Sequence, residues 1–232
     1  MKPTERATET AAKQAGAPAD ESAGNQPVEQ AGRHAASSVR KQATKPVRER
    51  LLDSADALLF VHGVISTPVD RILKDAQASP PSLYSHFGSK EGLIAAALRR
   101  RLHIWTGVWD AETAAADCPK DRALALWDAL TTYQGEHMTE RWCAFSGTAA
   151  AIEHPSAQLQ AVLDEETQLL RTRLLAAARE ITGEDSRAEA LASALMVAYT
   201  GTMSLMLRED YPTAIAEGRA SAEALIDAFA AA

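Results

Sequence analysis

The sequence predicts an all-α protein, with an N-terminal three-helix domain of the helix-turn-helix type followed by a larger helical domain. Two short helices each begin after a hydroxyl residue and a proline, at Thr67-Pro68 and Ser79-Pro80. The spacing between these starts leaves room for about two helical turns and a turn of three or four residues, the pattern of a helix-turn-helix. From residue 89 onward, apolar residues follow helical spacing, and no strand-like alternation is present.

The first 44 residues are rich in Ala, Gln, Glu, Ser and Gly and have almost no large apolar side chains. Such a segment cannot bury enough surface to offset the entropy of ordering it, so we expect a disordered tail. No apolar export signal follows Met1, which favours a cytoplasmic protein. The tail ends in a basic arm that either reaches DNA phosphates or the minor groove, or only aids solubility. Its basic residues are Arg33, His34, Arg40, Lys41, Lys45, Arg48 and Arg50.

A first amphipathic helix is expected over residues 47–62, with Gly63 ending it. The two motif helices follow, and we expect the Thr67 and Ser79 hydroxyls to cap them, with Pro68 and Pro80 at first helical positions. A third helix is expected over residues 89–115, with Ser89 as its cap. Lys90 in its first turn opposes the helix dipole, so we expect an anionic partner such as a phosphate.

The second motif helix carries an inward pair, Leu83 and Phe87, spaced four residues apart. This pair leaves a small, polar and aromatic outward face that suits the major groove of DNA, although an ordinary helical corner would show the same pattern. The outward residues are Pro81, Ser82, Tyr84, Ser85 and His86.

Residues 47–100 resemble the N-terminal domain of the tetracycline-repressor (TetR-like) family of transcription regulators. The resemblance is carried by Arg48-Glu-Arg-Leu-Leu-Asp-Ser-Ala55, Gly63, Thr67-x-Val69-x-x-Ile72, Ala76 and Ser82-Leu-Tyr-Ser-His-Phe-Gly-Ser-Lys-Glu-Gly-Leu93. It implies phosphate contacts by Thr67, Tyr84 and Lys90. It further implies that Pro80, Pro81, Ser82 and Ser85 lie nearest the bases and that His86 packs or bonds at the helix end.

The sequence departs from the family pattern at two places. Gln77 stands where the turn usually has glycine, so a non-glycine residue has to accept a positive φ. The aromatic side chain of the first helix comes one residue later, at Leu59-Phe60. Both departures concern geometry and remove no expected contact residue.

Charge is distributed unevenly along a chain whose formal net charge is −7. Residues 31–104 hold twelve Lys and Arg against six Asp and Glu, whereas residues 105–232 hold nine against twenty. Positive charge therefore accompanies the motif, as backbone affinity for DNA requires. The acidic remainder would repel DNA and help to orient the molecule on it.

We expect three parts: a tail over residues 1–44, a DNA-binding domain over 45–104 and a ligand-binding and dimerisation domain over 105–232. The last part should contain helices at about 120–137, 139–153, 155–182, 186–209 and 212–230. The segment Ala190–Leu207 has no charged residue, so we expect a buried helix and disfavour a membrane span. Its small residues recur every four positions and would admit a second backbone: Ala190, Ala194, Ala198 and Thr202. The family resemblance places dimerisation in residues 186–230.

Aromatic residues and a methionine gather in the middle helices, where the sensor of such a regulator is expected. They suit a small apolar or aromatic effector, although plain core packing explains any one of them. The candidates are Trp105, Trp109, Trp127, Tyr133, Met138, Trp142 and Phe145.

We find no motif for catalysis, for a phosphate loop or for a metal site, and no cofactor is expected. Cys118 and Cys143 do not form a Cys-x-x-Cys pair. The sequence therefore indicates a ligand-responsive, DNA-binding regulator, and in particular a repressor that binds a pseudo-palindromic operator as a homodimer. A helical ligand-binding protein that has lost DNA recognition remains an alternative, and an all-α enzyme is a remote one.

Overall fold

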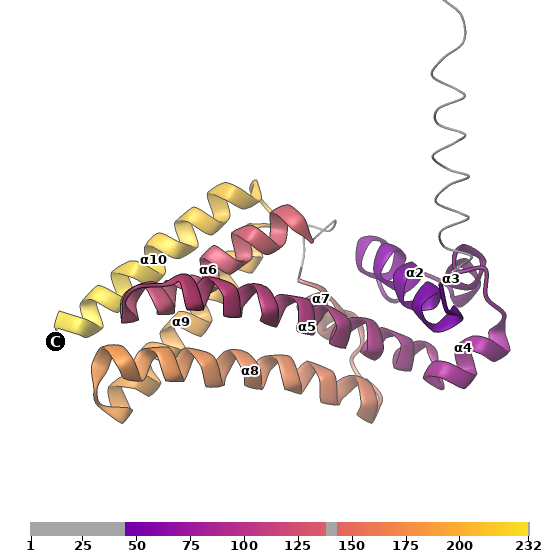
Figure 1. The fold of residues 1–232 in the computed structure, drawn as a ribbon, viewed down its shortest axis with the longest axis horizontal. Coiled ribbons are helices and arrows are strands. Elements are labelled where there is room, and N and C mark those ends of the chain that lie inside the picture. The colour runs from indigo at the N-terminus through magenta and orange to yellow at the C-terminus, as the bar shows by residue number, and fades with distance from the viewer. Residues whose placement is uncertain (1–44, 138–142, 232) are drawn as a thin grey trace, which may run out of the picture. The chain divides into compact units, whose positions relative to one another are not determined.

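The computed structural model describes residues 45–137 and 143–231, which form nine α-helices and no strand (Figure 1). The N-terminal helices are α2 (Val47–His62), α3 (Val69–Asp75) and α4 (Pro80–Phe87). The remaining helices are α5 (Lys90–Ala115), α6 (Pro119–Glu136), α7 (Ala144–Ala151), α8 (Ala157–Thr182), α9 (Asp185–Leu205) and α10 (Tyr211–Ala231). The all-α prediction is confirmed, and most expected helix ends lie within one or two residues of those observed.

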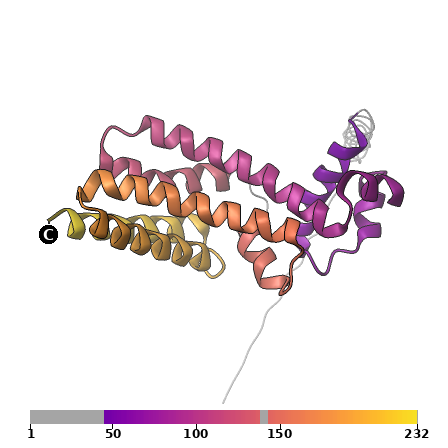
Figure 2. The same ribbon diagram turned by 90° about the horizontal axis from the view of Figure 1, so that it is seen from below.

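Helix α5 belongs to both halves of the described chain. It packs against α2 and α4 of the motif and also against α6 and α8. Figures 1 and 2 both show α8 running alongside α5. The domain boundary expected between residues 104 and 105 falls inside this continuous helix, so no linker separates the two halves there.

The predicted ends of the N-terminal helices are confirmed at two residues. Gly63 follows α2 with a φ of 95°, in the left-handed region that favours glycine. Ser89 caps α5, because its hydroxyl accepts a hydrogen bond from the Gly92 backbone N–H at 2.9 Å. These local signals place α2 and the start of α5 correctly.

The expected side-chain caps of the two motif helices are wrong. The Thr67 hydroxyl donates to the Leu58 carbonyl oxygen at 3.2 Å, and Pro68 takes the capping position of α3 without a side-chain hydrogen bond. Ser79 does precede α4, with Pro80 in its first turn, but its hydroxyl lies 3.0 Å from the Ser82 hydroxyl instead of binding a backbone N–H. Neither hydroxyl is therefore free to cap its helix, because Thr67 binds a distant carbonyl oxygen and Ser79 binds the Ser82 side chain.

The turn between α3 and α4 forms with Gln77 at a φ of 49°, as the sequence departure indicated. Arg50 of α2 holds this turn: its Nε donates to the Ala76 carbonyl oxygen at 2.9 Å and its Nη2 to the Gln77 carbonyl oxygen at 3.0 Å. Two hydrogen bonds from a charged donor therefore fix the backbone at a residue that prefers another conformation.

A second helix approaches α9 closely at Thr202, but this helix is α10 of the same chain. A methyl group at Gly218 of α10 would come within 1.9 Å of the Thr202 hydroxyl oxygen. Thr202 is buried and accepts a hydrogen bond from Trp127 Nε1 at 3.0 Å. The expectation that Thr202 lies in a row open to a partner is therefore corrected, and the close approach belongs to the core. None of the described helices is long and apolar enough to span a bilayer.

The positive φ at Gln77 predicts that Gln77→Gly stabilises the protein. Glycine adopts this conformation without steric cost, whereas another residue loses about 1 kcal/mol of stability there. Part of this gain is cancelled, because glycine also gives the unfolded chain more conformational freedom. We expect the free energy of unfolding, measured in urea, to rise by about 0.5 kcal/mol. Gln77→Ala retains the strain and should not raise it; a gain in that control would contradict the explanation.

Candidate DNA-binding surface and aromatic cavity

Helix α4 presents the outward face that the sequence predicts. Leu83 and Phe87 are buried against the helices around them, and the outward residues stand on the other side. Tyr84 is 54% exposed, and its hydroxyl makes no hydrogen bond with the residues described. Ser82 is half-buried, and the remaining outward residues are exposed: Pro80, Pro81, Ser85 and His86.

Two residues expected to touch phosphates are engaged inside the protein. Thr67 is fully buried and its hydroxyl is bound to Leu58, so its side chain is not available at the surface. Lys90 is half-buried and donates from Nζ to the Val64 carbonyl oxygen at 2.5 Å. Burial lowers the pKa of Lys90. The Val64 carbonyl oxygen thus takes part of the role expected for an anionic partner of Lys90. Two N–H donors of the Lys90 ammonium remain for a phosphate.

The positive charge of the motif region is less available to DNA than its sequence count indicated. Arg100 donates to Asp53 Oδ1 at 2.8 Å and also pairs with Asp56, while Arg101 Nε donates to Asp56 Oδ1 at 2.6 Å. Although burial alone would raise it, hydrogen bonds from Lys45 and Arg100 hold the pKa of Asp53 below its usual range. These arginines join α5 to α2 and do not form a surface for phosphates.

Other cations of the motif are exposed. The Arg48 guanidinium lies 5.5 Å from the centre of the Phe87 ring and pairs with Glu49 at 3.0 Å, beside the start of α2. Arg71 and Lys74 are exposed on α3, the first helix of the motif. No sequence motif indicated these two residues, although two basic residues three positions apart on one helix predict a basic exposed face.

An aromatic cavity lies among α5, α6, α8 and α9 and the start of α7. Its volume of about 40 Å³ has room for the equivalent of a few water molecules. We call this site the aromatic cavity. The residues that line it are Arg101, Trp105, Leu130, Tyr133, Cys143, Ala144, Phe145, Glu166, Tyr199 and Met203.

The structure brings together three of the seven predicted pocket residues, namely Trp105, Tyr133 and Phe145. Trp109 does not line the cavity; it packs beside Trp105 and beneath the Arg173 guanidinium, which is 4.9 Å from its ring centre. Trp127 is fully buried in the core. Both are therefore corrected to packing residues, because aromatic side chains at helical spacing serve equally as core. Met138 and Trp142 lie outside the described residues.

Polar groups converge on the aromatic cavity in a way that no sequence motif indicated. Burial raises the pKa of Glu166 to about 7. Burial, together with Cys143 and Glu166, raises the pKa of Tyr199. Burial and Glu166 also raise the pKa of the Cys143 thiol, so this cysteine is a poor nucleophile at neutral pH. An apolar cavity with a few convergent polar groups is typical of a ligand site.

Arg101 connects this cavity to the motif. It lines the cavity, pairs with Asp56 of α2, and lies with its guanidinium 4.4 Å from the centre of the Phe60 ring. A change in the position of Arg101 would therefore act directly on α2. Sequence spacing could not show this, because the contacts join residues more than forty positions apart.

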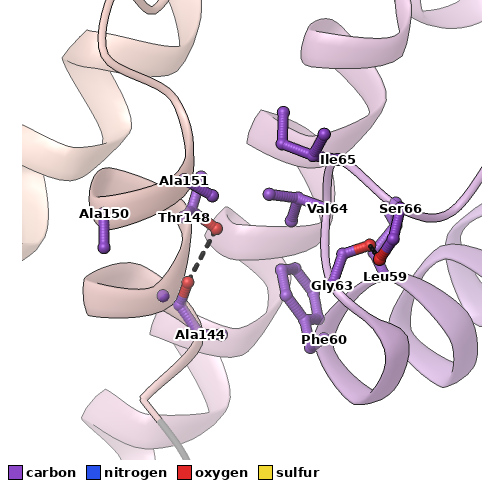
Figure 3. A pocket seen from close by; sticks show the side chains of 11 residues that line it. Leu59, Phe60, Gly63, Val64, Ile65, Ser66, Ala144, Thr148, Ala150 and Ala151 are labelled. Carbon is purple, nitrogen blue, oxygen red and sulfur yellow. Dashed lines mark hydrogen bonds between the residues drawn. The ribbon is translucent and has the colours of Figure 1, made fainter.

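A second hollow, the junction groove, separates the end of α2 from α7. Figure 3 shows Phe60 and Val64 on one side of it and Ala144 and Thr148 of α7 on the other. Its volume is about 500 Å³, and its lining is mostly apolar or glycine. The Thr148 hydroxyl is committed to the Ala144 carbonyl oxygen at 2.7 Å. The groove marks sparse packing where α7 meets the motif.

Comparison with known proteins agrees with this geometry. Residues 51–97 match the family model of the bacterial regulatory proteins of the tetR family. This part of the chain is therefore similar to that family. The matched residues run from α2 into α5 and include the whole helix-turn-helix. The description of the family is one of regulatory proteins, and the match covers the motif and not the later helices. No curated protein matches the chain.

Solved structures share the fold of this chain. A TetR-family transcriptional regulator from Streptomyces coelicolor, SCO4454, superposes with a TM-score of 0.72 at 20% identity, covering 79% of this chain and 96% of its own. Reduced NemR from E. coli gives 0.63 at 18% identity, with 78% and 97% covered. A TetR transcriptional regulator from Legionella pneumophila gives 0.63 at 20% identity, with 79% and 97% covered. At these identities the likeness concerns the fold alone.

The pKa of Glu166 predicts that Glu166→Gln stabilises the protein at high pH. In the unfolded chain this carboxyl ionises near 4.5, but in the folded chain it ionises near 7, so the folded state binds more protons between these values. The free energy of unfolding therefore falls as pH rises through this window. We expect Glu166→Gln to exceed the wild type by about 2 kcal/mol at pH 8 and to approach it at pH 4 to 5.

Urea denaturation at the two pH values measures this difference. Glu165→Gln makes the same chemical change at the exposed neighbouring residue, which does not line the aromatic cavity, and should follow the wild type. An equal gain in both variants, or none in Glu166→Gln at pH 8, would refute the assigned environment of Glu166.

Proposed function

We propose that the chain is a sequence-specific, DNA-binding transcriptional regulator, and in particular a repressor that binds a pseudo-palindromic operator as a homodimer and responds to a small effector. The observation that carries the proposal is the outer face of α4, where Tyr84 and its polar neighbours are exposed while Leu83 and Phe87 anchor the helix. A recognition helix needs this division, because its inner side must be held rigidly while its outer side enters the major groove.

The proposed contacts fall into two groups. Ser82 and Ser85 and the prolines Pro80 and Pro81 would face base edges and thymine methyl groups. The others would position the protein on the phosphates: Arg48, Arg71, Lys74, Tyr84, His86 and Lys90. Thr67 is left out because its side chain is buried. The turn that presents these residues is formed despite Gln77, so this departure from the family pattern does not disrupt the motif.

A homodimer is supported by an uncharged, exposed face of α9. Val197 is 72% exposed, and Ser193, Thr200 and Gly201 are exposed around it. An apolar and uncharged helix face of this kind is typical of a subunit interface. A twofold pair would present two α4 helices to half-sites about 34–36 Å apart.

Response to an effector is supported by the contacts of Arg101. This side chain lines the aromatic cavity and holds Asp56 and Phe60 of α2. A ligand that displaces it would shift α2 and the motif helices, and the junction groove leaves room for that shift. Ligand and operator would then oppose each other by the same coupling free energy in both directions.

Tyr84→Phe should weaken operator binding, because it removes a hydroxyl that the proposal places on a phosphate and leaves the ring in position. We expect a loss of about five- to tenfold in affinity, on the order of 1 kcal/mol, measured by fluorescence anisotropy at fixed salt. The operator is first found by footprinting the promoter region of the gene. Tyr211→Phe makes the same change at an exposed tyrosine of α10 and should have no effect. A protected site that lacks twofold symmetry, or equal affinity of Tyr84→Phe and wild type, would count against the proposed contacts.

Val197→Glu should convert the dimer to a monomer, because it places a carboxylate in the centre of the proposed interface. Light scattering after gel filtration gives the mass, and operator affinity should fall by at least tenfold with it. Val61→Glu introduces the same change at an exposed valine of α2 and should leave the mass unchanged. A dimeric Val197→Glu variant would show that the interface lies elsewhere.

A further inference from the structure

Glu166 contributes a carboxylate to the aromatic cavity, and it forms no ion pair with a cation in the described part of the chain. Among the described residues its one hydrogen bond comes from the Thr167 hydroxyl at 3.5 Å, which is the limit for such a bond. Arg101 lines the same cavity, and burial, opposed by the Thr167 hydrogen bond, raises the pKa of Glu166 to about 7. A half-buried carboxylate in this position is costly unless something binds to it.

Three aromatic rings stand around this carboxylate. The ring centres of Trp105 and Tyr133 are 5.5 Å apart in an edge-to-face arrangement, and those of Trp105 and Tyr199 are 6.4 Å apart and stacked. The Tyr199 side chain is buried, yet its hydroxyl makes no hydrogen bond within the described part of the chain. Aromatic faces attract cations through their quadrupoles, and they do so more strongly where water is excluded.

We propose that the aromatic cavity binds the head of a small organic ammonium ion, with Glu166 as its counter-ion and the rings of Trp105, Tyr133 and Tyr199 as its walls. This inference rests on the proposed ligand response and gives the chemical class of the ligand. An anion would meet the Glu166 carboxylate, and a purely apolar molecule would leave the carboxylate and the Tyr199 hydroxyl without partners. The volume of about 40 Å³ limits the bound part to a few heavy atoms.

The charge of the ligand also accounts for its effect on the motif. An ammonium ion in the cavity places a second positive charge near Arg101, whose Nε donates to Asp56 of α2 at 2.6 Å. Like charges repel strongly where the effective dielectric constant is low. Binding therefore drives Arg101 away from the cavity, and α2 moves with it.

Three probes of similar size but different charge test the proposal: propylammonium, 1-propanol and propionate. Each is titrated into the full-length protein at pH 8 and constant ionic strength, and the indole N–H signal of Trp105 is followed by NMR. Trp105→Phe identifies that signal among the four tryptophans. We expect a saturable shift with propylammonium and none with the other two.

Glu166→Gln should raise the dissociation constant for propylammonium at least tenfold, and Glu165→Gln should leave it unchanged. Equal binding of 1-propanol, unchanged binding to Glu166→Gln, or no saturable shift with propylammonium would each overturn the proposal. The operator footprint is measured separately without amine. If a palindrome is protected but no amine binds, the proposed ligand class is wrong and the regulatory function stands. If amine binding depends on Glu166 but no DNA is protected, the cavity site is supported and the regulatory function is contradicted.

Discussion

The ion-pair cluster between α2 and α5 fixes the position of the helix-turn-helix, and the other arrangements depend on it. Arg100 bonds Asp53 at 2.8 Å and the Leu52 carbonyl oxygen at 2.9 Å, while Arg101 bonds Asp56 at 2.6 Å. The Arg101 side chain is only 10% exposed, so this pair is screened little by salt. Removing either partner would leave a charge in a poorly hydrated place, a loss that typically costs several kcal/mol. The cluster therefore holds α2 rigidly against α5, and α2 in turn packs against α4.

That hold explains how the motif tolerates an unfavourable turn residue. Arg50 reaches from α2 to the carbonyl oxygens of Ala76 and Gln77, so α2 supports the turn from one side while α5 supports α2 from the other. Each layer of support rests on a guanidinium that donates to fixed acceptors, which is the geometry that arginine satisfies better than lysine. The exposed face of α4 is thus positioned by contacts that lie entirely outside it.

The sequence predicted those features that depend on local chemistry. Gly63, Ser89 and the Leu83–Phe87 pair act within one or two turns of the chain, and the structure confirms them. It failed where the partner is distant: Thr67 binds Leu58 on another helix, and Arg100 and Arg101 bind acids more than forty residues away. Charge counting could not distinguish arginines that face DNA from arginines that join helices. Glu166 was missed for the same reason, because only the fold surrounds it with aromatic rings from three other helices.

In the proposed response to a ligand, one side chain of this cluster, Arg101, connects the cavity to the motif. Arg101 cannot move out of the cavity wall without moving the Asp56 carboxylate, because their hydrogen bond is short and poorly hydrated. Phe60 lies against the same guanidinium and also lines the junction groove, so the displaced group enters space that is already open. The Arg101–Asp56 pair lies near the poorly packed junction groove, so a small displacement can pass to α2 without disrupting a packed core. A packed core is costly to deform. A cavity of small volume is sufficient for the proposed response, since the proposed ligand would have to change the charge beside Arg101 and would not have to push whole helices apart.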